Sequence, residues 1–422
     1  MICFWGFVCR WAVLLLCSLA ICHTALGQQA TWIATWTASP ETAAPDPGEP
    51  LLNLENQTIR ERVRITAGGK QIRLRLSNEC GSSALPIGRV SVGMAQDPAS
   101  VVVGSIREVR FGGQSSIVIP PGAPALSDPV NLPVSNGAQI TVSIYVPKRI
   151  TSVTLHGLAL RQSVVSTRGD HTQDLSIEAG KNSDSSAFLG AVLVPSADKR
   201  RVIVAFGDST VDGDGSTPEQ DRAWPSVLFR RLDSSNRAIQ YAVANAGLAG
   251  NRLLADGPIP DFGSSGLARY ERDALSVPGV TDIVVLEGTN DIGFPGAKFG
   301  DLALASAEDA PTMEDIVAAY RQLIARAHAR GIRVIGATIM PSEGVPIPGY
   351  HSDAKEKIRQ DVNDWIRTSR EFDDVVDFDA VVRDPDHPGR LLARFASKDH
   401  LHPNDEGYRA LGDKVAVSVL NR

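Results

Sequence analysis

The stretch Arg201–Gly213, RVIVAFGDSTVDG, begins as an apolar, β-branched run and breaks at Gly207, Asp208 and Ser209. Such a run predicts a buried strand, and the loop that follows presents a serine hydroxyl at the strand's carboxyl end. Ligands of open α/β sheets usually bind at this edge. Our hypothesis is that Ser209 is a nucleophile; the alternative is an ordinary turn, for which Gly, Asp and Ser are common residues.

Strand-like and helix-like segments alternate from Arg201 onward, which predicts a parallel sheet with helices on both faces. Thr312, Asp315 and Gly331 mark the start and end of the clearest helix as a capping box and a terminal glycine. The expected strands are Val202–Phe206, Ile239–Asn245, Ile283–Glu287, Val334–Thr338 and Val375–Phe378, and the expected helices are Trp224–Leu232, Thr312–Arg330, Asp353–Phe372 and Pro403–Leu420.

The preceding part of the chain, from Thr31 to Ala197, is β-rich and has no helix-period segment of useful length. Short strands with Gly, Pro, Asn and Asp turns predict an all-β sandwich or jelly roll. A small, charged stretch at Ser196–Arg200 separates the two patterns. We therefore expect a β-sandwich domain over residues 28–197 and an α/β domain over residues 198–422. The expected strands include Val63–Thr66, Gln71–Leu76, Ile87–Met94, Val101–Phe111, Ser115–Ile119, Gln139–Val146 and Ser152–Gln162.

The first 27 residues have the pattern of a secretory signal peptide. Arg10 precedes the apolar run Trp11–Cys22, and small residues in Ala25-Leu26-Gly27 suit a cleavage site. An uncleaved anchor is the alternative. We expect a secreted or periplasmic protein whose mature chain has no stable membrane insertion. The net charge of −6 over 422 residues gives no sign of a nucleic-acid partner.

A base for Ser209 is available near the C-terminus, in Asp399-His400-Leu401-His402-Pro403. Imidazole is the usual base for a serine, and a carboxylate three residues earlier can reach its Nδ1. This spacing favours His402 over His400. A surface histidine or a hydrogen-bonded core histidine is the alternative.

Two turns between nucleophile and base contain glycine and asparagine: Asn245–Asn251 and Gly288–Asp291. A glycine lets a backbone N–H approach a reacting carbonyl, and an asparagine amide supplies a second donor, as an oxyanion requires. Each is a common turn taken singly. Their placement after successive predicted strands indicates a site.

Four ordered blocks, Gly207-Asp208-Ser209, Gly250, Gly288-Thr289-Asn290-Asp291 and Asp399-x-x-His402, resemble those of the GDSL or SGNH hydrolases. The resemblance runs from about Arg201 to the C-terminus. It implies a flavodoxin-like three-layer α/β/α domain that hydrolyses esters through an acyl-serine. We expect an esterase that uses no cofactor or metal. By position, Ser209 is the nucleophile, His402 the base and Asp399 its orienting acid. The Ser209 N–H, the Gly250 N–H and the Asn290 side chain form the oxyanion hole.

The β-rich part resembles the front of secreted SGNH proteins of the acetylxylan-esterase-like kind, through Trp32–Pro40, Asn56–Arg60 and Arg73–Asn78. This likeness implies a short acyl ester on a plant polysaccharide. The substrate is alternatively a small-molecule ester. Within the enzyme class, the alternatives are a lipid esterase and an acyltransferase. An inactive carbohydrate-binding protein is the alternative outside it. The β-rich part is either a structural brace, which we favour, or a binding module.

The loop Asp212–Ser216, DGDGS, resembles the start of a calcium loop. However, Thr217 stands where that loop requires Gly, and Ala223 stands where it requires Glu. We therefore expect a solvated loop at the rim of the pocket and no metal.

Overall fold

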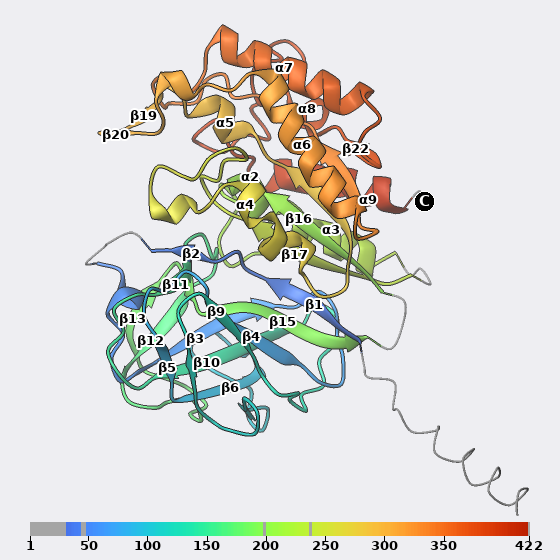
Figure 1. Cartoon of the computed structure of the whole chain (residues 1–422). Helices are drawn as coiled ribbons and strands as arrows, with labels where there is room; N and C mark the ends of the chain where they lie inside the picture. Colours follow the sequence, from blue (N-terminus) through green and yellow to red (C-terminus); the bar gives the residue numbers. More distant parts are fainter. Residues whose placement is uncertain (1–30, 44–47, 197–199, 236–238, 421–422) are drawn as a thin grey trace, which may run out of the picture. The chain divides into compact units, whose positions relative to one another are not determined.

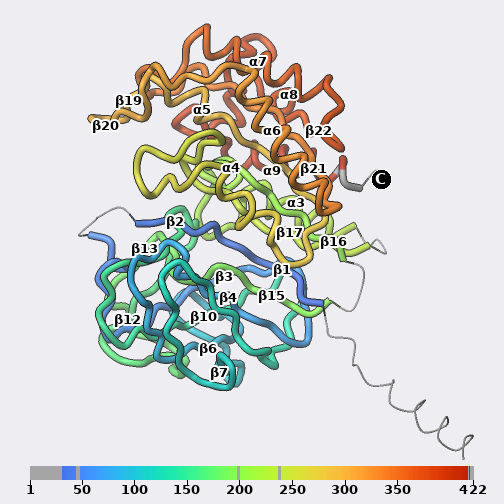
Figure 2. The backbone as a smooth tube through the Cα atoms, in the orientation of Figure 1, coloured from blue at the N-terminus to red at the C-terminus, as the bar shows by residue number. Residues whose placement is uncertain are grey.

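The computed structural model describes residues 31–43, 48–196, 200–235 and 239–420. The predicted signal peptide over residues 1–27 and the predicted boundary at 197/198 lie outside the described residues. A β-rich half, residues 31–196, precedes an α/β half, residues 200–420, and Figures 1 and 2 trace them from blue-green to yellow and red. From Trp32 onward both halves belong to one compact unit.

The α/β half is built on a parallel sheet in the strand order β17-β16-β18-β21-β22. Taken in chain order, this is the flavodoxin-like arrangement 2-1-3-4-5. The interior strand β16 is apolar on both faces, because Val202 and Val204 enter one core while Ile203 and Ala205 enter the other. The strands are β16 (Arg201–Gly207), β17 (Tyr241–Gly247), β18 (Val280–Leu286), β21 (Arg333–Ala337) and β22 (Asp374–Val376).

Helices cover both faces of this sheet, in agreement with the predicted three layers (Figure 1). One face packs against α3 (Trp224–Asp233), α8 (Phe378–Val382) and α9 (Asp405–Leu420). The other packs against α4 (Gly266–Tyr270), a π-helical turn η3 (Glu271–Leu275), α6 (Met313–His328) and α7 (Asp353–Thr368). The connections also contain α2 (Ser209–Asp212), α5 (Thr289–Gly293), η2 (Pro260–Phe262), η4 (Ala307–Asp309), β19 (Lys298–Phe299) and β20 (Leu302–Ala303).

The helix signals in the sequence are confirmed most clearly at α6. Thr312 and Asp315 form both arms of the capping box, and Gly331 follows with a φ of 68°. One strand prediction is wrong at its end: the apolar run Val375–Phe378 leaves β22 after Val376, and Phe378 begins α8. The reason is Asp377, whose side chain accepts the Ala380 N–H as an N-cap.

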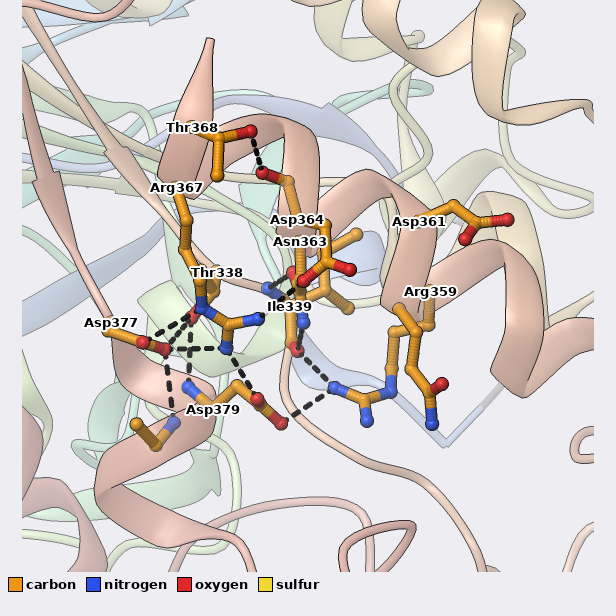
Figure 3. A network of polar contacts seen from close by, with 12 residues as sticks. Thr338, Ile339, Arg359, Asp361, Asn363, Asp364, Arg367, Thr368, Asp377 and Asp379 are labelled. Carbon is orange, nitrogen blue, oxygen red and sulfur yellow. Dashed lines mark hydrogen bonds and ion pairs between the residues drawn. The ribbon is translucent and has the colours of Figure 1, made fainter. Parts of the chain in front are cut away.

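Helix α7 is tied to the segments after β21 and β22 by two arginines (Figure 3). Arg359 donates to the Ile339 carbonyl and to Asp379, both at 2.8 Å. Arg367 donates to Asp377 at 2.8 Å and to Asp379 at 2.6 Å. These contacts hold the ends of two strands against the helix that covers them.

The β-rich half agrees with the all-β prediction, and its one helical turn in the described part is η1 (Pro50–Asn53). The sandwich or jelly-roll arrangement itself stays a prediction. One sheet has the order β1 (Thr31–Thr37), β15 (Leu189–Ser196), β4 (Arg73–Asn78), β9 (Ala123–Leu126). A second has the order β13 (Ala179–Ser183), β12 (Ser163–Arg168), β3 (Gln57–Arg64), β10 (Gln139–Val146), β6 (Arg89–Met94), β7 (Arg107–Val109). The smaller sheets pair β14 (Ser186–Ala187), β11 (Thr154–His156) and β2 (Glu41–Thr42), and β5 (Leu85–Ile87) with β8 (Ile117–Ile119).

Side chains of the β-rich half cover the outer edge of β17, the first strand in the parallel sheet's order. The Val243 N–H donates to the Thr66 hydroxyl at 3.0 Å, and the Thr37 hydroxyl donates to the Asn245 carbonyl at 2.6 Å. Buried apolar residues of both halves also join in one cluster, for example Val142 and Ile283. The edge of β17 would otherwise offer unpaired backbone groups, and side chains of the β-rich half form hydrogen bonds with these groups.

Candidate active site

Ser209 lies just beyond the end of β16, an interior strand of the sheet. Strand β16 stops at Gly207, and Asp208 caps the short helix α2 by accepting the Thr210 N–H at 2.9 Å. Gly207 is required by packing, because a Cβ there would lie 2.1 Å from the Leu286 carbonyl oxygen. Ser209 is the first residue of α2 and is 8% exposed.

The structure brings Ser209, His402 and Asp399 together in one hydrogen-bonded chain. His402 Nε2 lies 2.8 Å from Ser209 Oγ, and His402 Nδ1 lies 2.6 Å from Asp399 Oδ2. The other oxygen of Asp399 accepts the N–H groups of Leu401 and His402, each at 2.9 Å. The carboxylate is thus held in place and orients the imidazole, which faces the serine hydroxyl.

The electrostatics suit a histidine that receives a proton. Burial acts to lower the pKa of His402, but its hydrogen bond with Asp399 and the charges of Asp214 and Asp399 outweigh this and raise it. Burial acts to raise the pKa of Asp399, yet its hydrogen bond and charge interaction with His402 hold that pKa far below its usual range. Asp399 therefore stays ionised while His402 gains and loses a proton.

The two predicted oxyanion donors after β17 and β18 are linked to each other. Gly250 has a φ of 72°, and a Cβ on it would lie 2.3 Å from the Phe262 ring. Asn290 Nδ2 donates at 2.9 Å to the carbonyl of Asn251, the residue after Gly250. The sheet register sets Gly207 opposite Gly247 and Leu286, so all three loops leave at one edge.

Sequence reasoning missed two buried residues that support these donors. The Tyr350 hydroxyl donates to Asn290 Oδ1 at 2.9 Å and so fixes which way the amide faces. Arg269 donates to the Gly207 carbonyl at 2.7 Å, the Ala246 carbonyl at 2.8 Å and Asn251 Oδ1 at 2.7 Å. Neither residue lies in a block with a recognisable pattern, so no local signal marks them.

The DGDGS loop differs from the expected solvated loop. Asp212 is 5% exposed and Ser216 is 6% exposed, and Asp212 Oδ1 lies 3.0 Å from His156 Nε2. The prediction is wrong for Asp212, which contacts His156 of the β-rich half, a contact that local sequence does not reveal, whereas Gly215 is exposed as expected. Asp214 lies nearer the site, with Oδ2 3.7 Å from His402 Nε2. Of the described residues, no group of three or more His, Cys, Asp or Glu could hold a metal ion.

Ser209, His402 and Asp399 thus lie together at the carboxyl edge of a flavodoxin-like sheet, in the hydrogen-bonded order that serine hydrolases use. Residues 205–410 match the model of the GDSL-like lipase/acylhydrolase family. This match supports the GDSL/SGNH family for the α/β half, and the protein is accordingly a carboxylic ester hydrolase. Helices long and apolar enough to cross a membrane do not occur in the described part of the chain.

Solved structures with similarity to the chain share low identity with it. A lipase/acylhydrolase from Enterococcus faecalis is 20% identical, with a TM-score of 0.39, over 53% of this chain and 96% of that one. A carbohydrate acetylesterase from Sinorhizobium meliloti is 16% identical, with a TM-score of 0.39, over 52% and 99%. The aryl esterase of M. smegmatis is 18% identical, with a TM-score of 0.40, over 52% and 99%. No curated protein sequence matches the chain significantly.

Proposed function

We propose that this protein is an exported serine esterase that removes short acyl groups, chiefly acetyl, from a polysaccharide such as xylan. The observation that carries the reaction type is the chain Ser209–His402–Asp399, with contacts of 2.8 and 2.6 Å. Export rests on the signal-like residues 1–27. The short acyl group and the polysaccharide rest on the resemblance of the β-rich half to acetylxylan-esterase-like proteins.

In the proposed mechanism, Ser209 Oγ attacks the ester carbonyl while His402 Nε2 takes its proton. The backbone N–H groups of Ser209 and Gly250 and the side chain of Asn290 stabilise the oxyanion. His402 then protonates the departing alkoxide, which leaves an acyl-serine. Water, deprotonated by His402, releases the acid and restores the enzyme.

The test is hydrolysis of p-nitrophenyl esters from acetate to palmitate by the wild type and by Ser209→Ala. We expect preference for acetate and loss of nearly all activity in the variant. Ser369, at the C-cap of α7, offers a matched serine-to-alanine control that should keep full activity.

Each other outcome has a defined meaning. Full activity in Ser209→Ala would show that another group is the nucleophile. Preference for long chains would place the protein among lipid esterases. No turnover of any ester would favour a carbohydrate-binding protein instead. Release of acetate from acetylated xylan then tests the polysaccharide substrate.

A further inference from the structure

Helix α2, which begins with Ser209, is four residues long and depends on outside contacts for its position. Asn245 Nδ2 donates to the carbonyls of Val211 at 3.0 Å and Asp212 at 3.2 Å. Gly247 packs so closely that a Cβ would lie 2.2 Å from the Asp212 N atom. The backbone at the end of α2 is therefore held by strand β17.

The side chain at the end of α2 is held by the β-rich half. His156, the last residue of β11, places Nε2 3.0 Å from Asp212 Oδ1 and Nδ1 3.0 Å from the Ser39 carbonyl. Both ring nitrogens face acceptors, so a charged imidazolium satisfies both contacts. The side chains of His156 and Asp212 are only 11% and 4% exposed.

The surrounding charges agree with this protonation state. Burial acts to lower the pKa of His156, but the charge and hydrogen bond of Asp212 outweigh this and raise it to about 9. Glu61, from β3, is a further acidic group that interacts with His156. The contact between His156 and Asp212 is therefore a buried, charge-assisted hydrogen bond near neutral pH.

The loop after α2 has a second attachment to the same half. Arg62 pairs with Glu219, and Arg64 pairs with Asp221 at 2.6 Å. Glu219 and Asp221 have φ values of 67° and 51°, a region that non-glycine residues rarely adopt. The Glu219 N–H also donates to the Leu160 carbonyl at 2.8 Å. Contacts from the β-rich half thus hold the loop in a strained conformation.

We propose that His156 is a positioning residue for Ser209, acting from the β-rich half through Asp212. The inference rests on the proposed function, since it concerns the same nucleophile. Asp212 stands one helical turn beyond Ser209, so a change at one end of α2 moves the other. A brace of this kind would set the distance from Ser209 Oγ to His402 Nε2.

The test measures kcat and KM for a p-nitrophenyl ester, per active site titrated with a p-nitrophenyl phosphonate. We expect His156→Ala and Asp212→Ala each to lower kcat on the order of 10- to 100-fold, with KM within about twofold, because a misplaced reactive group costs rate more than binding. The double variant should lose no more than either single one, because both remove the same contact.

Two conservative variants separate positioning from charge. Asp212→Asn can donate to neutral His156 and keeps the length of the side chain, so we expect kcat near that of the wild type. Asp212→Glu keeps the charge but adds a methylene, so we expect a low kcat. His171→Ala is the matched control, because His171 pairs with Asp174 at 2.7 Å within the β-rich half.

Unchanged kcat in folded His156→Ala would overturn the inference. If an alanine variant does not fold, the conservative pair decides. If Asp212→Glu has the kcat of the wild type and Asp212→Asn has a lowered kcat, the charge of Asp212 matters and the position of its carboxylate does not. That result would contradict the inference. Full activity in Ser209→Ala would instead overturn the proposed function itself, whatever the His156 variants show.

Discussion

At the scale of single residues, the site combines one close carboxylate with one more distant carboxylate around the same imidazole. Asp399 contacts His402 Nδ1 at 2.6 Å, whereas Asp214 Oδ2 lies 3.7 Å from Nε2, on the side that faces Ser209. Both charges raise the pKa of His402. The first also orients the ring, while the second acts through its charge alone.

We predict that Asp214→Asn moves the acid limb of the pH profile of kcat/KM to lower pH. His402 must be neutral to accept a proton, so activity falls in acid as the ring becomes protonated. The raised pKa of His402 sets this fall above the ordinary histidine range, and loss of one raising charge lowers it. Profiles of the two proteins in the same buffers provide the measurement. If the acid limb stays at the same pH, the charge of Asp214 does not affect the pKa of His402. The matched control is Asp413→Asn, because Asp413 pairs with Arg231.

We predict that Asn290→Ala lowers kcat by on the order of 10²–10³ and leaves measurable activity, because one of three oxyanion donors is lost. Tyr350→Phe should have a smaller effect, since it frees the amide to rotate without removing it. In the Asn290→Ala background, Tyr350→Phe should add little further loss, because its hydrogen-bond partner has gone. Additive losses in the double variant would show that Tyr350 acts independently of Asn290.

At the scale of elements, helices of different length are held in different ways. Helix α6 carries its own stop and start signals, with a capping box at Thr312 and a left-handed glycine after its end. Helix α2 has only Asp208 as a cap and takes its other anchors from β17 and β11. Local sequence therefore defines the long helix, whereas distant contacts define the short one.

We predict that Thr312→Ala lowers the free energy of unfolding by about 1 kcal/mol, the usual cost of losing an N-cap hydroxyl. Urea unfolding at neutral pH provides the measurement. Thr312→Ser keeps the hydroxyl and should restore most of the stability. Because α6 carries none of the proposed catalytic residues, kcat should be unchanged. Equal stability of the Ala and Ser variants would contradict the contribution of the cap.

At the scale of the whole molecule, the two halves share a buried core and a buried acidic region near their contact. Burial raises the pKa of Glu41 and of Glu61 from 4.5 to about 8. The folded state therefore holds these protons more tightly than the unfolded chain does. Stability from this source is present below the unfolded pKa and is lost as pH rises towards about 8.

We predict that Glu61→Gln flattens the loss of stability with rising pH. Glutamine can still accept the Ala187 N–H but has no proton to lose. Urea unfolding of both proteins at pH 5 and pH 9 provides the measurement. The variant should gain stability relative to the wild type at the higher pH. If the variant and the wild type differ in free energy of unfolding by the same amount at both pH values, the ionisation of Glu61 does not contribute to the pH dependence of stability.

The accuracy of the sequence predictions depended on how local each signal was. The predicted strand Gln139–Val146 coincides with β10, and the predicted capping box of α6 is present. The predicted strand Ser152–Gln162 is instead β11 (Thr154–His156) followed by a loop, because residues after His156 turn towards the α/β half. The turn depends on contacts such as that of Leu160 with Glu219, which no local pattern encodes.

The sequence by itself determined the class of fold and the candidate residues Ser209, Asp399, His402, Gly250 and Asn290, because each follows a strand or stands at a short, recognisable spacing. Only the tertiary structure decided how these groups meet and what supports them. His156 reaches Asp212 across 56 residues, and Tyr350 reaches Asn290 across 60. Such contacts form only when the chain buries both partners together, so spacing along the sequence carries no trace of them.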